Sequence, residues 1–145
     1  MSKRVPFETT LEVRDTCLCL HTQRAARALA RHFDEALRPT SLTNQQYSLL
    51  MALNRPEPPT MAPVADLLAM DRTTLTAALK PLERRGLVRV EPSPADRRSR
   101  LLVLTEAGSE TLAAAVPIWR ATHEAIEAGI EPERLRGALQ TLAKV

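Results

Sequence analysis

Two short apolar-periodic stretches, separated by only a few residues, constrain the fold of this chain more than any other feature. Residues 61–69 and the residues between the turn at 70–72 and Gly86 each place apolar side chains on one helical face, and residues 70–72 leave room only for a tight turn. The inward positions are Val64, Leu67 and Leu68 in the first stretch and Leu75, Leu79 and Leu82 in the second. Thr60 is placed to cap the first stretch, and Gly86 ends the second. Two such helices form a helix-turn-helix.

A β-hairpin is predicted directly after the second helix. Residues 87–90 and 100–104 are β-prone, and the proline-rich, charged sequence EPSPADRRS separates them. Two strands with a long polar tip predict a wing beside the helix-turn-helix. Pro81 is unusual, because a proline inside a helix removes a backbone hydrogen bond at a cost of about 3 kcal/mol. We infer a local bend there.

Longer helical segments precede this unit. Residues 11–38 have one apolar stripe with arginines interleaved, which predicts a single long helix that Pro39 stops. Residues 44–54 predict a second helix with Thr43 as its N-cap. The proline-rich residues 55–59 then form a stiff linker to the helix-turn-helix.

Two more helices follow the predicted hairpin. Thr105 is placed to cap a helix that reaches about residue 128, with a kink or break expected at Pro117. Residues 132–144 carry leucines on one face and predict a last helix. The first and last helices hold more apolar surface than a small module needs, and a partner subunit is the simplest way to bury it.

These elements predict a mainly α protein with a small β-hairpin wing, which is a winged helix-turn-helix with N- and C-terminal dimerisation helices. We divide one compact unit into an N-terminal dimerisation helix (1–42), the winged helix-turn-helix (43–104) and C-terminal dimerisation helices (105–145). The length of 145 residues suits one core and leaves no room for a separate catalytic domain.

Positive charge is concentrated in one part of the sequence. The net charge is +3, but residues 71–100 carry eight basic and four acidic side chains, so the rest of the chain is slightly negative. Such clustering is typical of a surface that faces phosphates, and a solvated arginine-rich face is the alternative. Aromatic residues make up only 3%, which argues against single-stranded nucleic acid as the ligand.

The second helix of the helix-turn-helix presents polar side chains away from the core. If its leucines face inward, Arg72, Thr73, Thr76, Ala77 and Lys80 point outward. Arginine pairs with guanine and threonine contacts thymine in the major groove, whereas lysine suits a phosphate. The alternative for the threonines, Thr74 included, is helix capping and surface filling.

Several motifs in this region occur in a fixed order. Leu82-Glu83 precedes Gly86-Leu87-Val88, Asp96-Arg97-Arg98 lies in the predicted wing, and Leu104-Thr105 with Gly108 opens the next helix. In this order and spacing, the sequence resembles the MarR family of bacterial transcription regulators. The resemblance covers essentially the whole chain, although the first and last helices match only in pattern.

The resemblance implies a cytoplasmic, bacterial homodimer, associated with the nucleoid when bound, that reads a palindromic operator in double-stranded DNA and by default represses transcription. It places Arg97 in the minor groove, where a narrow groove attracts arginine, and Asp96 orients the wing arginines by ion pairing. The candidate DNA-binding residues are Arg72, Thr73, Thr74, Thr76, Lys80, Asp96, Arg97 and Arg98.

Family members usually respond to a small ligand or to an oxidant. A small lipophilic or aromatic effector is expected in a pocket formed by the helices at 11–38, at 44–54 and after Thr105. The candidate pocket residues are His32, Phe33, Tyr47 and Met51. Side chains of this kind at helical spacing are more often part of the core.

Thiol oxidation is the alternative way of sensing. Cys19 lies 24 residues before Thr43, which resembles the peroxide-sensing branch of the family. That branch supplies tyrosines to the cysteine, where this chain has Gln23 and Phe33. Cys17 could act as a resolving neighbour between subunits or after local unwinding, since positions i and i+2 of a helix point to different sides. Otherwise both cysteines are small buried hydrophobes.

Other classes of function have little support. The sequence has no phosphate-binding glycine loop, nucleophile elbow or HExxH motif, so we expect neither an enzyme nor a cofactor. Cys17 and His21 are two potential ligands, too few for a metal site. No apolar run is long enough to span a membrane, and the N-terminus lacks a signal-peptide core, which favours the cytoplasm. A protein-binding winged helix would not need both Arg72 and Arg97.

Overall fold

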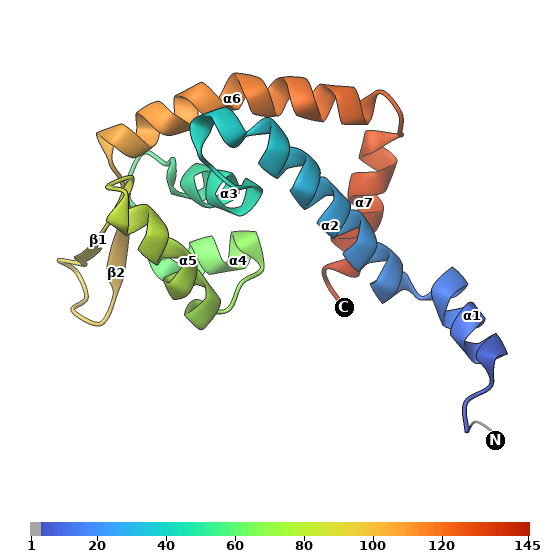
Figure 1. Ribbon diagram of the computed structural model, residues 1–145. Helices are drawn as coiled ribbons and strands as arrows, with labels where there is room; N and C mark the ends of the chain where they lie inside the picture. The colour runs from blue at the N-terminus through green and yellow to red at the C-terminus, as the bar shows by residue number, and fades with distance from the viewer. Residues whose placement is uncertain (1–3) are drawn as a thin grey trace.

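A computed structural model describes residues 4–145, so the first three residues of the expected N-terminal segment lie outside the described part (Figure 1). The order of elements is α1 (Phe7–Thr16), α2 (Leu18–Ala36), the 3-10 helix η1 (Arg38–Thr40), α3 (Asn44–Leu53), α4 (Met61–Leu68), α5 (Arg72–Arg84), β1 (Val88–Pro92), β2 (Arg100–Leu104), α6 (Glu106–Glu127) and α7 (Pro132–Leu142). The protein is therefore mainly helical with one two-stranded antiparallel hairpin, as predicted.

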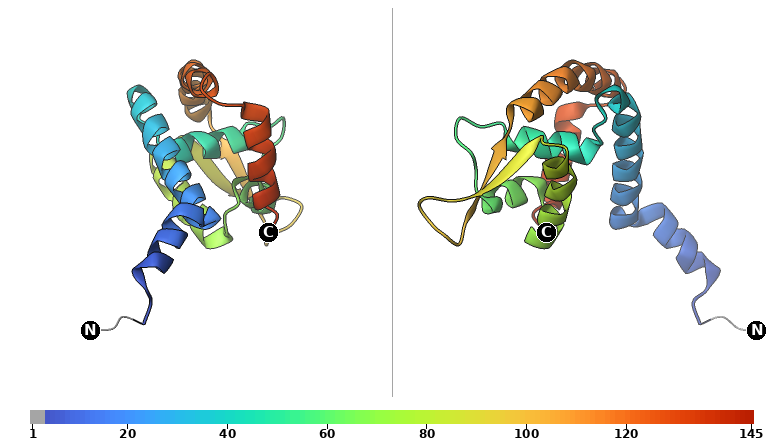
Figure 2. Two further views of the ribbon diagram at one scale, coloured as in Figure 1. Left: turned by 90° about the vertical axis from the view of Figure 1, so that its right-hand side faces the viewer. Right: turned by 60° about the vertical axis from the view of Figure 1, so that its left-hand side comes forward.

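Helices α3, α4 and α5 and the hairpin of β1 and β2 form the winged unit, and the longer helices α2 and α6 form an arch over it. In Figure 1, α6 passes over α3, while α4, α5 and the hairpin lie below it and α2 runs down the opposite side. Both views in Figure 2 show α1 projecting away from the rest of the chain, beyond the first residues of α2. No helix in the described part of the chain is long and apolar enough to cross a membrane.

The core lies where the winged unit meets the arch. Its fully buried side chains come from the end of α2 and from α3, α4, α5 and β2; they are Leu37, Leu49, Leu50, Val64, Leu75, Leu82 and Leu102. The predicted inward face of α5 is confirmed, because Leu79 is buried with its neighbours. Since α5 is anchored by this face, its opposite face is left to solvent.

Side-chain caps set most of the helix boundaries where the sequence predicted them. Thr43 and Gln46 form a reciprocal capping box at the start of α3, and the Thr105 hydroxyl accepts a hydrogen bond from the Gly108 amide. Gly86 follows α5 with φ +72°, a left-handed conformation that glycine adopts without strain. The prediction of a cap at Thr60 was wrong, because its side chain makes no capping hydrogen bond at the start of α4. The Thr60 backbone forms a β-bridge to Leu101.

The hairpin follows the predicted alternation with small differences in length. Val88 pairs with Leu104 and Pro92 with Arg100, so β1 begins one residue later and ends two residues later than predicted. The Leu102 amide donates to the Pro59 carbonyl at 2.8 Å. The proline-rich linker therefore lies along the free edge of β2.

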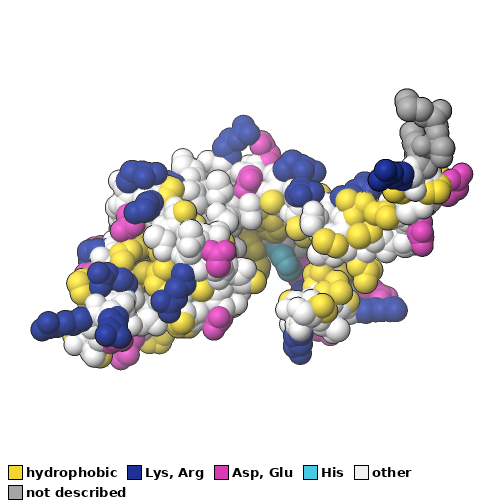
Figure 3. All heavy atoms as spheres, turned by 90° about the horizontal axis from the view of Figure 1, so that it is seen from below, with side chains coloured by type: hydrophobic (Ala, Val, Ile, Leu, Met, Phe, Trp, Pro, Cys, Tyr) yellow, Lys and Arg dark blue, Asp and Glu magenta, His cyan; other side chains and the backbone are white. Residues whose placement is uncertain are grey.

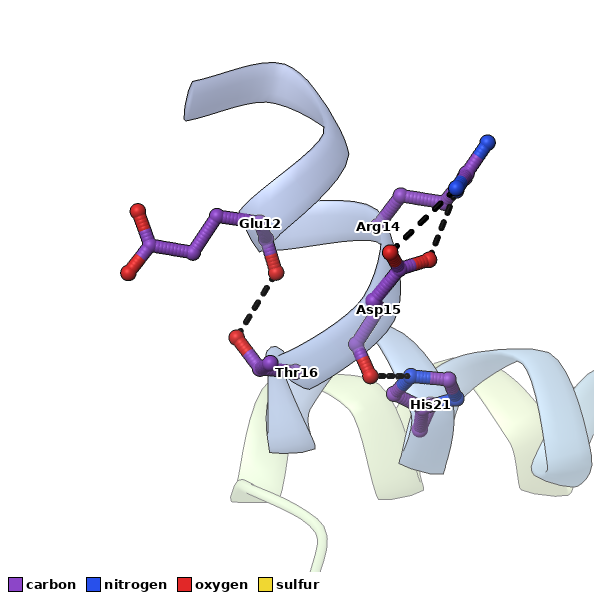
Figure 4. Close-up of polar contacts among 5 residues, drawn as sticks. All are labelled: Glu12, Arg14, Asp15, Thr16 and His21. Carbon is purple, nitrogen blue, oxygen red and sulfur yellow. Dashed lines mark hydrogen bonds and ion pairs between the residues drawn. The ribbon is translucent and has the colours of Figure 1, made fainter. Parts of the chain in front are cut away.

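The first predicted helix is divided in two, which corrects the prediction of one helix over residues 11–38. α1 begins earlier, at Phe7, and the chain leaves helical geometry at Cys17, with φ −70° and ψ 111°. The Cys17 sulfur accepts a hydrogen bond from the Leu20 amide at 3.4 Å, which caps α2. A second hydrogen bond crosses the break: His21 Nε2 of α2 donates to the Asp15 carbonyl of α1 at 3.1 Å (Figure 4).

One further prediction, about the inward face of α4, was wrong. Leu67 is 65% exposed, because α4 packs through Val64 and Ala65 and Leu67 lies about 100° around the helix from that face. Pro117 was expected to kink α6 or to break it. The helix is not broken there, since it runs without interruption from Glu106 to Glu127, and the kink stays a prediction.

Large apolar side chains are exposed on the elements outside the winged unit. They lie on α1, α2 and α7 and include Phe7, Val13, Leu18, Leu29, Leu135, Leu139 and Leu142. Figure 3 shows this apolar surface on the side that carries the N-terminus, separated by a recess from the winged unit. We refer to these seven residues as the apolar end face.

Candidate nucleic-acid interface

The outward face of α5 lines a shallow groove of about 540 Å³. Five of its residues match the predicted outward positions, and two, Pro81 and Arg84, were not among those positions; together they are Arg72, Thr73, Thr76, Ala77, Lys80, Pro81 and Arg84. Arg84 follows Lys80 by one helical turn, so helical spacing alone could have identified it. The groove is rich in arginine and lysine and has no acidic side chain among its lining residues.

A second groove, of about 600 Å³, lies between α5 and the first turn of α3. Thr73 and Thr74 line it from α5, and Gln45 and Gln46 line it from α3. Thr74 therefore lies toward α3, away from the first groove. No sequence pattern places Gln45 here, because residues 45 and 74 meet only in the folded chain.

The N-terminus of α5 is fixed by Asp71. Its carboxylate accepts a hydrogen bond from the Thr74 amide at 2.7 Å, and this bond holds the pKa of Asp71 below its usual value. The carboxylate consequently stays ionised, which suits the positive end of the helix dipole. α5 continues through Pro81 to Arg84, so the proline does not terminate the helix.

The tip of the wing is held by Asp96, but not through the predicted ion pairs. Its carboxylate accepts hydrogen bonds from the Arg98 amide at 2.9 Å and from the Ser99 hydroxyl at 3.3 Å. Within the described residues Asp96 forms no ion pair with a wing arginine. A short side chain that bonds the backbone two residues ahead closes the turn itself. Asp96 thus orients the arginines through the backbone.

The arginines of the wing, Arg97, Arg98 and Arg100, are exposed. Arg97 and Arg98 lie at the tip, and Arg100 donates from Nη1 to the Arg97 carbonyl at 3.3 Å. Arg100 therefore braces the backbone that presents Arg97. Arg100 was not among the predicted DNA-binding residues, although its place two residues after Arg98 in the same basic segment is a signal that could have identified it.

A third, smaller hollow of about 290 Å³ brings the wing and the helix-turn-helix together. Arg72 and Thr76 of α5, Arg98 and Arg100 of the wing, and the start of α4 at Thr60 surround it. Three guanidinium groups and a helix N-terminus favour an anion at this place. Figure 3 shows basic side chains spread over this end of the molecule.

A cavity of about 310 Å³ lies between α2, α3 and α6, the three elements from which an effector pocket was expected, and its use by an effector stays a prediction. Phe33 and Tyr47 line it, whereas His32 is exposed and Met51 is outside its lining. Both side chains lie on other sides of their helices and do not line this cavity. The remaining lining residues are Leu29, Leu37, Asn44, Ser48, Trp119 and His123.

An aromatic column forms one wall of this cavity. Trp119 stacks on Tyr47 with ring centroids 6.2 Å apart and on His123 at 4.9 Å. Burial raises the pKa of Tyr47, so its hydroxyl remains a hydrogen-bond donor. His123 Nδ1 lies 2.7 Å from Glu127, which also pairs with Arg136 of α7. Trp119 and His123 are one turn apart on α6, but no sequence pattern connects them to Tyr47.

The two cysteines lie at the break between α1 and α2. Both are free thiols; Cys19 is exposed and Cys17 half-buried. The Gln23 side-chain amide donates to the Cys19 sulfur at 3.2 Å, so this glutamine supplies the kind of donor that the sequence alone did not assign to it. Arg14 pairs with Asp15 at 2.7 Å (Figure 4). The expectation that a continuous helix keeps the thiols apart does not hold, because the helix is broken at Cys17.

A helix-turn-helix beside a β-hairpin, with basic side chains on both, defines a winged helix-turn-helix protein. Residues 40–99 match the sequence profile described as MarR family. The organic hydroperoxide resistance transcriptional regulator of Bacillus subtilis (strain 168) is 31% identical over 126 residues, which cover 86% of each chain. Other curated regulators are matched over 64% and 50% of their own lengths. The chain belongs to the MarR family of transcription regulators.

Solved structures agree with this assignment. The M. tuberculosis transcriptional regulator MosR, solved in complex with DNA, superimposes with a TM-score of 0.82 at 38% identity, over 89% of this chain and 95% of that chain. CouR from Rhodococcus jostii RHA1, bound to p-coumaroyl-CoA, gives a TM-score of 0.76 at 27% identity, over 89% of this chain and 93% of CouR. The protein is therefore a DNA-binding transcription regulator and not an enzyme.

Proposed function

We propose that the protein is a homodimeric repressor that binds a palindromic operator and is released from it by a small-molecule effector. The observation that carries the proposal is the pairing of two exposed basic elements, the outward face of α5 and the tip of the wing, on one side of the winged unit. The DNA complex of MosR supports the same use of the fold. Because DNA is the partner, the protein acts in the bacterial cytoplasm, at the nucleoid when bound.

Each predicted DNA-binding residue has a place in this proposal. Arg72, Thr73 and Thr76 face base edges in the major groove, and Thr74 lies at the rim toward α3. Lys80 contacts a phosphate farther along α5. Arg97 enters the minor groove, with Asp96 closing the turn that presents it.

Phosphates occupy the hollow between the wing and the helix-turn-helix. Arg98, Arg100 and the start of α4 surround it, and guanidinium groups bind phosphate oxygens in pairs. These contacts carry no sequence information, but they fix the position of the winged unit on the duplex.

The homodimer forms through the apolar end face. A protein of this size does not leave so many large apolar side chains in water, and two copies related by a twofold axis cover each other's surface. Twofold symmetry of the protein in turn requires a palindromic operator.

The effector occupies the cavity lined by Phe33, Tyr47 and Trp119. Its aromatic wall favours a flat, apolar or aromatic ligand, and Asn44, Ser48 and the Tyr47 hydroxyl provide a few polar contacts. The p-coumaroyl-CoA complex of CouR supports a small-molecule effector with an aromatic group. The cavity lies between α2 and the winged unit. A bound ligand would therefore alter the spacing of the two α5 helices, one from each protomer, which are the recognition helices of the proposed dimer.

The direct experiment selects bound fragments from the DNA of the source organism and then screens aromatic compounds for release. We expect inverted half-sites about one helical turn apart, or a multiple of that distance. Trp119→Ala should retain operator binding and lose the response to the effector, while Met51→Ala, outside the cavity, serves as the matched control. Selected fragments without dyad symmetry would contradict the homodimer on a palindrome.

A second candidate function is oxidant sensing through Cys19. Two observations favour it: Cys19 is exposed with an amide donor on its sulfur, and Cys17 lies at a break in the helix. The name of the B. subtilis relative, an organic hydroperoxide resistance regulator, points to the same chemistry. A hydroperoxide would oxidise the Cys19 thiol to a sulfenic acid and leave as the alcohol. The Cys17 thiol would then form a disulfide and release water.

The two modes of release are separated by peroxide titration of the DNA complex. Oxidant sensing predicts dose-dependent release that Cys19→Ser abolishes, and recovery with a thiol reductant. Cys17→Ser distinguishes a disulfide from a stable sulfenic acid, since only the disulfide requires the second thiol. A wild-type complex that does not respond to hydroperoxide eliminates this candidate and leaves the small-molecule effector.

A further inference from the structure

Two adjacent arginines at the end of α5 have different surroundings. Arg84 lines the groove along the outward face of the helix. Arg85, the C-cap residue, donates from Nη1 to the backbone carbonyl of Ser41 at 2.8 Å, across a sequence separation of 44 residues. Arg85 therefore connects the end of α5 to the corner between α2 and α3.

The corner that accepts this hydrogen bond is held in place by its own contacts. Ser41 has a left-handed backbone with φ 59°, and its amide donates to the Arg38 carbonyl at 2.9 Å. The flanking Leu37 and Leu42 are buried in the core. Asp34 of α2 accepts hydrogen bonds from both the amide and the side chain of Asn44, at 2.6 and 2.8 Å. The Ser41 carbonyl is thus fixed relative to α2.

The rest of α5 is not fixed to α2 in this way. α5 packs mainly on α4 and β1, whereas α2 packs on α3 and α6. Within residues 4–145, the bond from Arg85 to Ser41 is the one side-chain hydrogen bond or ion pair that joins α5 to the corner. On the opposite side, the Thr105 hydroxyl donates to the Gly86 carbonyl at 2.7 Å and ties the same turn to α6. The end of α5 is therefore held from two sides.

We propose that Arg85 is a positioning residue, which sets the inclination of α5 relative to α2 and thereby the spacing of the two recognition helices in the dimer. It does not act as a phosphate contact, because its guanidinium is directed to Ser41. This role rests on the proposed function, since spacing matters only for a dimer on two half-sites. Its neighbour Arg84 contacts a phosphate.

The salt dependence of operator binding separates the two arginines. Each phosphate contact contributes about one to the slope of log affinity against log salt. Arg84→Ala should therefore lower the slope by about one. Arg85→Ala should weaken binding by about tenfold, from the loss of a hydrogen bond with a charged donor, and leave the slope unchanged. A slope that falls equally in both variants would overturn the positioning role.

A second readout tests spacing itself, which a merely structural residue would not affect. Wild-type protein should bind an operator with one base pair inserted between its half-sites much more weakly than the natural operator. Arg85→Ala and Arg85→Met should lose most of this discrimination. Ser41→Gly is the matched control, because it retains the accepting carbonyl and suits the left-handed backbone. Unchanged discrimination in both Arg85 variants would refute the proposal.

Circular dichroism and thermal unfolding establish that each variant is folded before binding is measured. Arg85→Met keeps the aliphatic stem of the side chain and removes only the donor, so it remains informative if the alanine variant unfolds. Failure of the wild type to bind any paired half-sites would refute the proposed function instead. The two failures are therefore distinguishable.

Discussion

Individual arginines of the wing differ in their electrostatic surroundings. Arg97 is exposed at the tip and its backbone is braced by Arg100, whereas Arg89 of β1 is neutralised by an ion pair with Glu91. An arginine free of an acidic partner is available to the minor groove of DNA, and a paired one must first give up its carboxylate. The sequence indicated the basic wing, but only the fold separates these two arginines.

Arg97→Ala should weaken operator binding by about tenfold to a hundredfold, which is the range for a groove contact. Dimerisation and helix content should not change, because the side chain packs against nothing in the core. Gel-shift titrations at fixed and at varied salt measure the effect, with Arg89→Ala as the matched control on the same hairpin. An affinity equal to that of the wild type would remove Arg97 from the interface.

Gly108 has a steric role that the sequence motif alone did not explain. A Cβ at this position would lie 2.1 Å from the Leu87 carbonyl oxygen, so the start of α6 and the turn after α5 could not stay in contact. We expect Gly108→Ala to lower the free energy of unfolding by about 3 kcal/mol through overpacking. Urea unfolding of the wild type and of Gly108→Ala measures this difference in the free energy of unfolding.

Gly137 provides the control for that substitution, because it lies in α7 with nothing within 4 Å of an added Cβ. Gly137→Ala should stabilise the protein by up to about 1 kcal/mol through helix propensity. If both alanine variants were equally stable, close packing of Gly108 against the Leu87 carbonyl would not be the reason for glycine in this motif.

At the scale of elements, boundaries governed by local chemistry were predictable. Thr43, Gly86 and Thr105 each mark a helix end through a cap or a left-handed turn that depends on a few neighbouring residues. The break at Cys17 was not predictable, since no proline or glycine occurs there. It is held by the Cys17 sulfur and by His21, which act only after the chain has turned.

The candidate site likewise has one part that follows from local sequence and one part that only the fold brings together. The outward residues of α5 follow from helical periodicity, so the sequence located them correctly on one groove. The cavity proposed for the effector combines Phe33 and Tyr47 with Trp119, from three elements far apart in sequence. A single sequence cannot show which helices converge, and so Trp119 and His123 were missed.

The Asp71 cap at the start of α5 makes the stability of the protein depend on pH. Asp71 accepts the Thr74 amide, which lowers its pKa below 3.8 in the folded state. A lowered pKa means that the stabilisation is fully present above 3.8 and is lost as the pH falls through the folded-state value. Asp71→Asn still offers an oxygen to the cap but does not titrate.

We therefore expect the stability of the wild type to fall more steeply than that of Asp71→Asn below pH 3.8, with little difference in steepness above it. Urea unfolding of both proteins across this pH range measures the difference, and other carboxylates titrate equally in both. Parallel pH profiles would show that the Asp71 cap makes no titratable contribution to stability.

At the scale of the whole molecule, the apolar surface and the charged surface lie on different parts of the chain. The apolar end face lies on α1, α2 and α7, whereas the basic residues that line the grooves of the candidate interface lie on α5 and the wing. Figure 3 shows further basic side chains beside the apolar region, so it is the large exposed apolar side chains that distinguish that part of the surface. The cavity with the aromatic column lies between these two parts. A ligand there contacts both α2 and α3, so it can couple the dimer interface to the DNA-binding surface without touching DNA.

The dimer itself is tested by placing a charge on the apolar end face. Leu139 of α7 is 44% exposed in the protomer, and in a twofold interface Leu139→Glu would bury two carboxylates. We expect the dimer dissociation constant to rise on the order of a hundredfold or more. Because one winged unit contacts only half of a palindrome, operator binding should fall with it. Light scattering and gel shifts on the same samples measure both effects.

Leu67→Glu is the matched control, since Leu67 is 65% exposed on α4 and lies outside the apolar end face. Both substitutions exchange an exposed leucine for glutamate on a helix, so general losses of stability or solubility should be similar. Only Leu139→Glu should yield monomers. A Leu139→Glu protein that remains dimeric and binds the full operator would place the dimer interface elsewhere, and the other six residues of this face would then require a different partner.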